Sequence, residues 1–227
     1  MLRQGSNCEI IDVEGKNPLH WGASSGGGGA KNPSSDPVKT VQVLLEAGPK
    51  VANWQDYEGR TPLHLAVADS FVDVVEGLLK HDKIQINALD ANFRSALHWA
   101  AVLGKSIICM LLLENGARFH CQDANGATPL HYAIQAGMTD TVETLMRKPE
   151  VFDHPDLCGR TALMWAAALP NLPQAAEMIR SLCRHGSDHG HQDLDEWNAL
   201  HVAVANCHLS AIDTLITLGD MSLFFSI

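Results

Sequence analysis

Four potential metal ligands, one thiol and three imidazoles, lie close together in one stretch of the chain at Cys183, His185, His189 and His191. Cysteine and histidine side chains bind zinc and copper readily, so metal binding is one hypothesis for this chain. Two observations oppose it. We expect Cys183 to face a helical core while His189 and His191 lie in the following loop, and the spacing matches no familiar zinc module. We therefore assign no metal ligand and keep metal binding as an alternative.

Five further histidines recur at one position, in the first turn of a short predicted helix, and could act as catalytic bases. They are His20, His64, His98, His131 and His201. None of them is paired with a Ser or Cys nucleophile in an evident arrangement, so we predict no catalytic residue and no enzyme. We expect these rings to bridge backbone groups of adjacent loops through their two nitrogens. In the remaining copy Met164 replaces the histidine, and that interface should depend more on apolar burial.

The histidines belong to a four-residue motif that begins a helix and is repeated along the chain. Its copies start at Asn17, Thr61, Ser95, Thr128, Thr161 and Asn198, and the fourth residue recurs after 44, 34, 33, 33 and 37 positions. Thr or Ser before a helix caps a backbone N–H, and proline suits the first turn because its missing N–H would have no partner there. A period near 33 built on T-P-L-H-x-A is typical of ankyrin repeats. The sequence therefore predicts an all-α ankyrin-repeat solenoid of about six helix-turn-helix repeats with β-hairpin finger loops.

The third repeat shows the predicted unit most clearly. Ser95 caps a first helix that ends at Gly104, and a second helix, with apolar residues at 107, 108, 111 and 112, ends at Gly116. Helices this short are marginal in water, so their stability must come from stacking against neighbouring repeats. Several copies lack the expected glycines. Ser70, Pro170 and Cys207 replace the glycine between helices, and Phe93 and Glu196 replace the one in the turn.

We expect one continuous solenoid over residues 1–227, with repeats at about 12–55, 56–89, 90–122, 123–155, 156–192 and 193–220. Residues 24–37 are rich in Gly, Ser and Pro, which predicts a flexible insertion between the helices of the first repeat. Residues 1–11 resemble the close of an incomplete repeat, and residues 221–227 form an apolar tail. Neither end resembles the polar cap that solenoids need, so we expect a fragment of a longer array or an unusual isoform.

Charge and composition narrow the class of partner. The 16 basic and 26 acidic residues give a net charge of −10, which disfavours nucleic acids and anionic membranes and favours basic protein segments. The longest apolar run, residues 107–113, is too short to span a bilayer. Residues 29–32 fail the phosphate-loop pattern, so no cofactor is predicted. The six cysteines include no C-x-x-C pair, which indicates reduced thiols in an intracellular compartment.

The predicted working surface is the concave face, formed by the finger tips and by the positions that close the first helices. Side chains there have no packing role in this interpretation, so they can recognise a protein partner, and Tyr, Trp and Arg often carry interface energy. The residues at these positions are Tyr57, Glu58, Arg60, Asp69, Asn92, Arg94, Leu103, Asn125, Gln135, Leu157, Arg160, Leu169, Asp195 and Trp197.

Some stretches are more specific than the general ankyrin pattern. They are residues 12–21, 53–64, 93–101, 126–133 and 164–167, including Asn53-Trp54-Gln55-Asp56-Tyr57 and Met164-Trp165, which that pattern does not require. Over roughly residues 10–170 the chain resembles the inversin family of ciliary ankyrin proteins. The resemblance implies a cytoplasmic scaffold of cilia and microtubule structures that restrains Wnt signalling, with ciliary and Dishevelled/Wnt-pathway proteins as partners. The alternative to this family is a generic ankyrin adaptor module of a larger signalling or ubiquitin-ligase protein.

Overall fold

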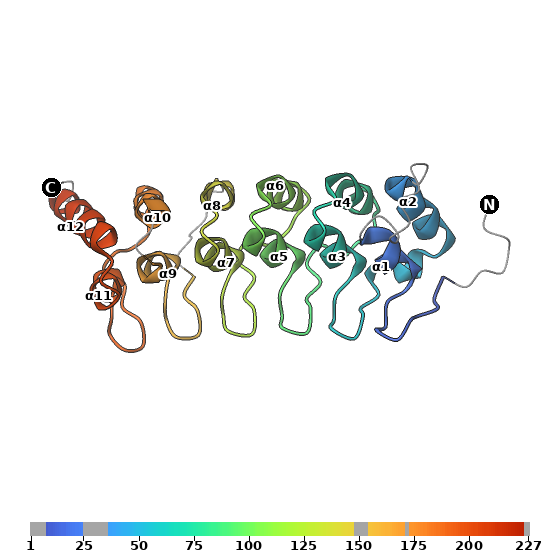
Figure 1. Ribbon diagram of the computed structural model, residues 1–227, viewed down its shortest axis with the longest axis horizontal. Coiled ribbons are helices and arrows are strands. Elements are labelled where there is room, and N and C mark those ends of the chain that lie inside the picture. Colours follow the sequence, from blue (N-terminus) through green and yellow to red (C-terminus); the bar gives the residue numbers. More distant parts are fainter. Residues whose placement is uncertain (1–7, 25–35, 148–153, 171–172, 225–227) are drawn as a thin grey trace. The chain divides into compact units, whose positions relative to one another are not determined.

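A computed structural model describes residues 8–24, 36–147, 154–170 and 173–224 (Figure 1). Its α-helices are α1 (Pro18–Ala23), α2 (Pro37–Ala47), α3 (Pro62–Ala68), α4 (Val72–Leu79), α5 (Ala96–Val102), α6 (Ser106–Glu114), α7 (Pro129–Gln135), α8 (Thr139–Met146), α9 (Ala162–Ala168), α10 (Pro173–Arg184), α11 (Ala199–Ala205) and α12 (Leu209–Phe224). A 3₁₀ helix, η1 (Pro49–Asn53), follows α2. The predicted alternation of a first and a second helix is confirmed. Most of the predicted insertion, at residues 25–35, lies outside the described residues, as do 1–7 and 225–227.

The chain forms two compact units, whose division falls within the third repeat. Unit 1 comprises residues 1–100 and 107–118, and unit 2 comprises residues 101–106 and 119–227. Within unit 1, α1 packs on α2 and α3, while α4 packs on α2 and α3. The first helices therefore stack on first helices and the second on second, which is the arrangement that a repeat needs to bury its apolar face.

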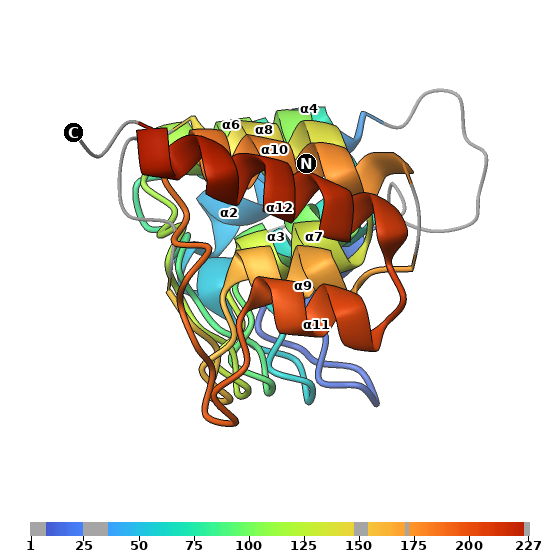
Figure 2. The same ribbon diagram turned by 90° about the vertical axis from the view of Figure 1, so that its left-hand side faces the viewer.

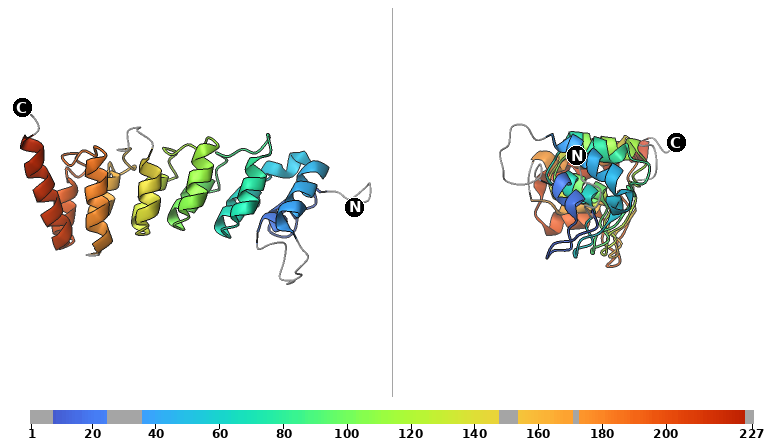
Figure 3. Two further views of the ribbon diagram at one scale, coloured as in Figure 1. Left: turned by 90° about the horizontal axis from the view of Figure 1, so that it is seen from above. Right: turned by 90° about the vertical axis from the view of Figure 1, so that its right-hand side faces the viewer.

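Unit 2 has the same two layers. The first helices α7, α9 and α11 pack in sequence, and the second helices α8, α10 and α12 do likewise. Figure 2 shows α9 directly behind α11 and α10 behind α12, and the left view of Figure 3 shows α8, α10 and α12 side by side. Between the layers lie fully buried side chains such as Ile134, Leu163, Met178 and Leu182. Within this unit the finger loops all extend from the first-helix layer, away from the second helices (Figure 1).

Helix ends follow the expected capping chemistry. In α3 and α7 the N-cap threonines Thr61 and Thr128 form a reciprocal capping box with His64 and His131. In α1 and α11 the N-cap residue is Asn17 or Asn198, whose side-chain oxygen accepts the N–H of the motif histidine. Each cap satisfies a donor that the helix cannot satisfy itself, which typically stabilises a helix by about 1 kcal/mol.

The positions where glycine is replaced keep the backbone conformation of glycine. Ser70, Phe93, Glu196 and Cys207 have φ between +52° and +63°, in the left-handed region that costs other residues about 1–2 kcal/mol. Pro170 cannot follow them, because its ring fixes φ near −65°. The chain instead leaves α9 in an extended conformation at Leu169 before α10 begins.

Two details differ from the expected repeat. The fingers are turns rather than paired strands, since among the described residues strand-like pairing is limited to one isolated bridge between Leu89 and Ser95. The second difference is that α12 continues through Phe224, so residues 221–224 of the predicted tail are part of a helix. Among the described helices, none is long and apolar enough to cross a lipid bilayer.

Candidate partner-binding surface

Each finger is built around an aspartate carboxylate. In the third finger, Oδ1 of Asp90 accepts the backbone N–H groups of Asn92 and Arg94, at 2.9 Å each. The same pair of hydrogen bonds, from the residues two and four positions later, is made by Asp12, Asp56, Asp123, Asp156 and Asp193. One carboxylate oxygen therefore holds the turn in every finger, which is the local bonding that aspartate favours in turns.

The second carboxylate oxygen binds side chains. Oδ2 of Asp90 accepts Nε of Arg94 at 2.9 Å and the indole N–H of Trp99 at 3.0 Å, and the guanidinium lies 5.0 Å from the Trp99 ring. Asp156 makes the same contacts with Arg160 and Trp165. Burial alone raises the pKa of Asp90, but the hydrogen bonds from the backbone and side chain of Arg94 and from Trp99 outweigh it and hold that pKa below its ordinary value.

The motif histidines connect each finger to the next, as predicted. Nδ1 of His64 accepts the Thr61 N–H at 3.2 Å, and Nε2 lies 3.1 Å from the carbonyl oxygen of Arg94 in the following finger. His20 and His131 make the equivalent contacts to the carbonyls of Arg60 and Arg160. Burial lowers the pKa of His64 and of His131 to about 4, so both rings are neutral at pH 7, and they serve as structural links.

Met164 breaks this series and leaves a defect. The hydroxyls of Thr61 and Thr128 contact the motif histidine of their repeats, whereas the Thr161 hydroxyl is buried with no hydrogen-bond partner among the described residues. Met164 is 1% exposed. Trp197 of the next finger presents its carbonyl in the place that the Arg160 carbonyl has one repeat earlier, since each accepts the N–H of its finger aspartate. The expected reliance on apolar packing therefore comes with one unsatisfied polar group.

Met164→His should repair this defect. The imidazole can accept the Thr161 N–H, pair with its hydroxyl and reach the Trp197 carbonyl, and each recovered hydrogen bond is worth about 1 kcal/mol. After the loss of the methionine's apolar contacts, we expect a net gain of about 1 kcal/mol in the free energy of unfolding at pH 7.5, measured by urea denaturation. Met164→Leu is the control, which keeps apolar volume and leaves the hydroxyl unpaired. A histidine variant less stable than the leucine variant would contradict this account.

Two of the histidines that the metal-binding alternative invokes bond to different segments. Nδ1 of His185 lies 2.8 Å from the carbonyl oxygen of Ser181 in its own helix, whereas Nε2 of His191 lies 2.9 Å from the carbonyl oxygen of Gly159 in the preceding finger. Within the part of the chain that the structure describes, no three His, Cys, Asp or Glu side chains are placed to hold a metal ion. The metal alternative thus has no coordination geometry to support it.

The thiol of Cys109, on α6, is buried, and burial raises its pKa to about 12. It is therefore a small apolar core residue rather than a reactive thiol. Ile107, expected on the buried face of the same helix, is 58% exposed, and Cys109 contributes to the core there.

The predicted partner-binding residues fall into three groups. Exposed finger-tip side chains are Tyr57, Glu58, Asn92, Asn125, Leu157, Asp195 and Trp197. Residues that close the first helices are Asp69, Leu103, Gln135 and Leu169, of which Leu169 is half-buried. The third group consists of Arg60, Arg94 and Arg160. Each of these arginines forms an ion pair with the aspartate of its own finger, so they have a structural role in addition to their predicted role in recognition.

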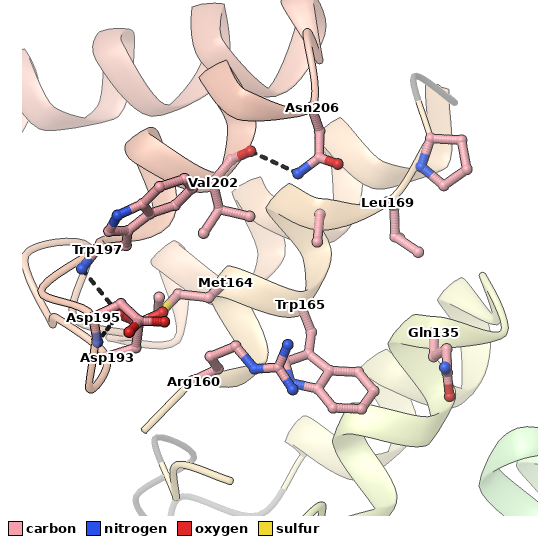
Figure 4. Close-up of a pocket in the computed structure, with 12 residues that line it drawn as sticks. Gln135, Arg160, Met164, Trp165, Leu169, Asp193, Asp195, Trp197, Val202 and Asn206 are labelled. Carbon is pink, nitrogen blue, oxygen red and sulfur yellow. Dashed lines mark hydrogen bonds between the residues drawn. The ribbon is translucent and has the colours of Figure 1, made fainter. Parts of the chain in front are cut away.

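Five of these residues meet in unit 2 around one pocket of about 670 Å³ (Figure 4). They are Gln135, Arg160, Leu169, Asp195 and Trp197. Its wall is completed by Met164, Trp165, Ala168, Pro170, Asp193, Val202 and Asn206, which the sequence analysis missed. Its residues come from two successive fingers and from α7, α9 and α11. The pocket offers an apolar floor, two indoles and both signs of charge, which is the usual make-up of a specific binding site.

Comparison with known proteins is consistent with this geometry. A family profile described as "Ankyrin repeats (3 copies)" matches residues 1–90, 30–123, 83–154 and 148–223. The chain belongs to the ankyrin-repeat family. A crystal structure of an ankyrin repeat protein has the same fold, with a TM-score of 0.73 and 22% identity, covering 79% of this chain and 91% of that one. Ankyrin repeats, like other solenoids, bind proteins through surfaces formed by successive repeats.

The curated relatives make the similarity more specific, as the sequence analysis expected. Human inversin is 42% identical over 217 residues, which is 93% of this chain and 19% of inversin. Mouse inversin is 42% identical over 220 residues, and zebrafish inversin 42% identical over 226 residues. The ankyrin chain thus spans about a fifth of the length of these relatives.

Proposed function

We propose that this ankyrin chain is a non-enzymatic, inversin-like scaffold that binds segments of other proteins across its finger tips and first-helix ends. One observation carries the proposal. Large apolar side chains such as Tyr57 and Leu157, 72% and 68% exposed, project from fingers whose backbones are already fixed by hydrogen bonds. Exposed aromatic and aliphatic residues on rigid loops are common features of recognition surfaces.

The inversin similarity extends the proposal to partners and location. We place the chain inside the cell, in cilium- and microtubule-associated assemblies, with ciliary and Dishevelled/Wnt-pathway proteins as partners. The net charge of −10 favours partners with basic segments, because opposite charge accelerates encounter and weakens with salt. Charge reversal at Glu58 and Asp69 should therefore slow association at low ionic strength more than at moderate ionic strength.

Affinity capture from ciliated cells tests this function. The chain is compared with Tyr57→Ala/Leu157→Ala, which removes two exposed side chains that the finger backbones do not need. The matched control is Glu114→Ala/Arg184→Ala, two exposed positions at the ends of the second helices α6 and α10. The fingers extend from the first helices and not from these (Figure 1). We expect the unchanged chain and the control to capture specific ciliary or Wnt-pathway proteins. The finger variant should recover at least fivefold less of these proteins. Equal recovery with all three proteins would refute recognition by the fingers.

A further inference from the structure

The sixth finger lacks the arginine that forms an ion pair with the aspartate in three of the other fingers. At four positions after the aspartate, the second, third and fifth fingers carry Arg60, Arg94 and Arg160, and each arginine bonds Oδ2 of its aspartate. The sixth finger has Trp197 there, and Val202 takes the place of the indole donor. Oδ1 of Asp193 holds the turn as usual, but in the described part of the chain no donor contacts its Oδ2.

This unneutralised carboxylate lines the pocket described above. Asp193 and Asp195 stand on one side with the Trp197 indole, and Met164 and Val202 supply apolar surface beside them (Figure 4). Trp197 is 45% exposed, so part of its ring remains available to a partner.

The one cation of the lining does not cancel these charges. Arg160 forms an ion pair with Asp156 of its own finger, with Nη2 2.9 Å from Oδ2, and its guanidinium lies over the Trp165 ring at 5.5 Å. Its charge is thus compensated locally. The two carboxylates of Asp193 and Asp195 remain as net negative charge next to an exposed indole.

We propose that the pocket binds an arginine side chain of a protein partner. The guanidinium would occupy the place that the chain's own arginine has in the second, third and fifth fingers, donating to Oδ2 of Asp193, with Asp195 nearby and the Trp197 ring as a stacking surface. Arginine fits better than lysine, because its planar fork bonds a carboxylate while it stacks on an aromatic ring. This inference rests on the proposed function, since it names a side chain that the scaffold recognises.

The fingers themselves show that this geometry is favourable. In Asp90–Arg94–Trp99 and Asp156–Arg160–Trp165, a carboxylate, a guanidinium and an indole contact one another at hydrogen-bond and ring-stacking distances. A partner's arginine on Asp193 and Trp197 would bring the same three groups together between two chains, with the indole four rather than nine positions after the aspartate. The methylene stem of that arginine would lie on the apolar floor, in the way that long cationic side chains cover apolar surface.

Direct titration with N-acetyl-arginine amide tests the proposal. The full chain, labelled with ¹⁵N, is titrated while the indole N–H signal of Trp165 is followed, because this residue lines the pocket and is retained in every variant. N-acetyl-citrulline amide is the neutral isostere, and N-acetyl-lysine amide separates planar hydrogen bonding from charge alone. We expect saturable shifts with the arginine compound, weaker binding of the lysine compound and none of the citrulline compound.

Two variants and a control make the test specific. Asp193→Asn keeps the oxygen that holds the turn and removes the charge, so the arginine compound should bind at least about tenfold more weakly. Trp197→Arg supplies the missing arginine within the chain and should abolish binding. Asp213→Asn, an exposed change on α12, should leave binding unchanged. Equal binding of arginine and citrulline compounds, or undiminished binding by Asp193→Asn, would overturn the proposal even if Trp197→Arg failed to fold.

The arginine titration and the capture experiment can fail independently of each other. The capture experiment changes Tyr57 and Leu157, neither of which lines this pocket. If capture depends on those residues while the arginine compound does not bind, the scaffold function stands and the arginine pocket is wrong. If the compound binds but no partner is captured, the pocket is real and the proposed function is wrong.

Discussion

Lowering the pH from 7 to 5 should destabilise the protein by about 4 kcal/mol, with His64 and His131 responsible for about 2 kcal/mol each. Burial lowers the pKa of both rings in the folded chain to about 4, although hydrogen bonds to the carbonyls of Arg94 and Arg160 act in the opposite direction. In the unfolded chain a histidine titrates near about 6.5, so the unfolded state binds protons first as the pH falls. Stability is therefore full above about pH 6.5 and is lost as the pH approaches about 4.

Urea denaturation at pH 7.5, 6 and 5 measures this loss, and a histidine variant identifies its source. His64→Gln should be less stable at pH 7.5, because it disturbs the cap at Thr61. Its further loss on going to pH 5 should be about 2 kcal/mol smaller than that of the unchanged chain, since His131 and His20, whose pKa burial also lowers, still contribute. The lowered pKa values of Asp90 and Asp156 act in the same direction only below about pH 4. An equal pH dependence in the variant and the parent would exclude the histidine explanation.

Gly126→Ala should lower the free energy of unfolding by about 3 kcal/mol or more. Gly126 has φ of +76°, which costs alanine about 1–2 kcal/mol, and an added Cβ would lie 2.6 Å from the backbone nitrogen of Leu157. That nitrogen donates to the carbonyl oxygen of Asn125 at 2.9 Å, so the new methyl group also displaces the next finger and weakens a hydrogen bond.

Gly137→Ala is the matched control in the same unit. Its φ is +71°, but an added Cβ would meet no atom within 4 Å. We expect the free energy of unfolding of this variant to fall only by the conformational cost of a positive φ, about 1–2 kcal/mol. The difference between the free energies of unfolding of the two variants then measures the effect of the steric clash between neighbouring fingers. If both variants lose the same stability, the clash adds nothing to the cost of the positive φ.

Periodicity carried most of the fold prediction. The motif beginning at Ser95 predicted a first helix, which the structure has at Ala96–Val102, and the aligned glycines of other copies indicate the positive φ found at Phe93 and Cys207. Both inferences succeed because one repeat resembles the next, so a single aligned position has one backbone conformation in every copy. The extended course at Leu169 also follows from the proline beside it.

The binding surface was harder to predict, because it depends on differences between repeats. The sequence analysis treated Arg94 and Arg160 as free, although the spacing of aspartate, arginine and tryptophan at intervals of four and nine could have indicated their pairing. Predicting the pocket would also have required noticing that Trp197 and Val202 interrupt this spacing in the sixth finger. A repeat pattern predicts shared structure, whereas a specific site arises where one copy departs from it.

The hydrogen bonds between successive fingers have a consequence for how readily this surface can evolve. Ala91 and Leu157 each donate a backbone N–H to the preceding finger, at Glu58 and Asn125, and neither side chain takes part in that bond. Substitution at these positions can therefore change what the surface recognises without weakening the junction beneath it. Proline is the exception, since it has no N–H to donate. The molecule thus separates the part of each finger that must be kept from the part that selection can alter freely.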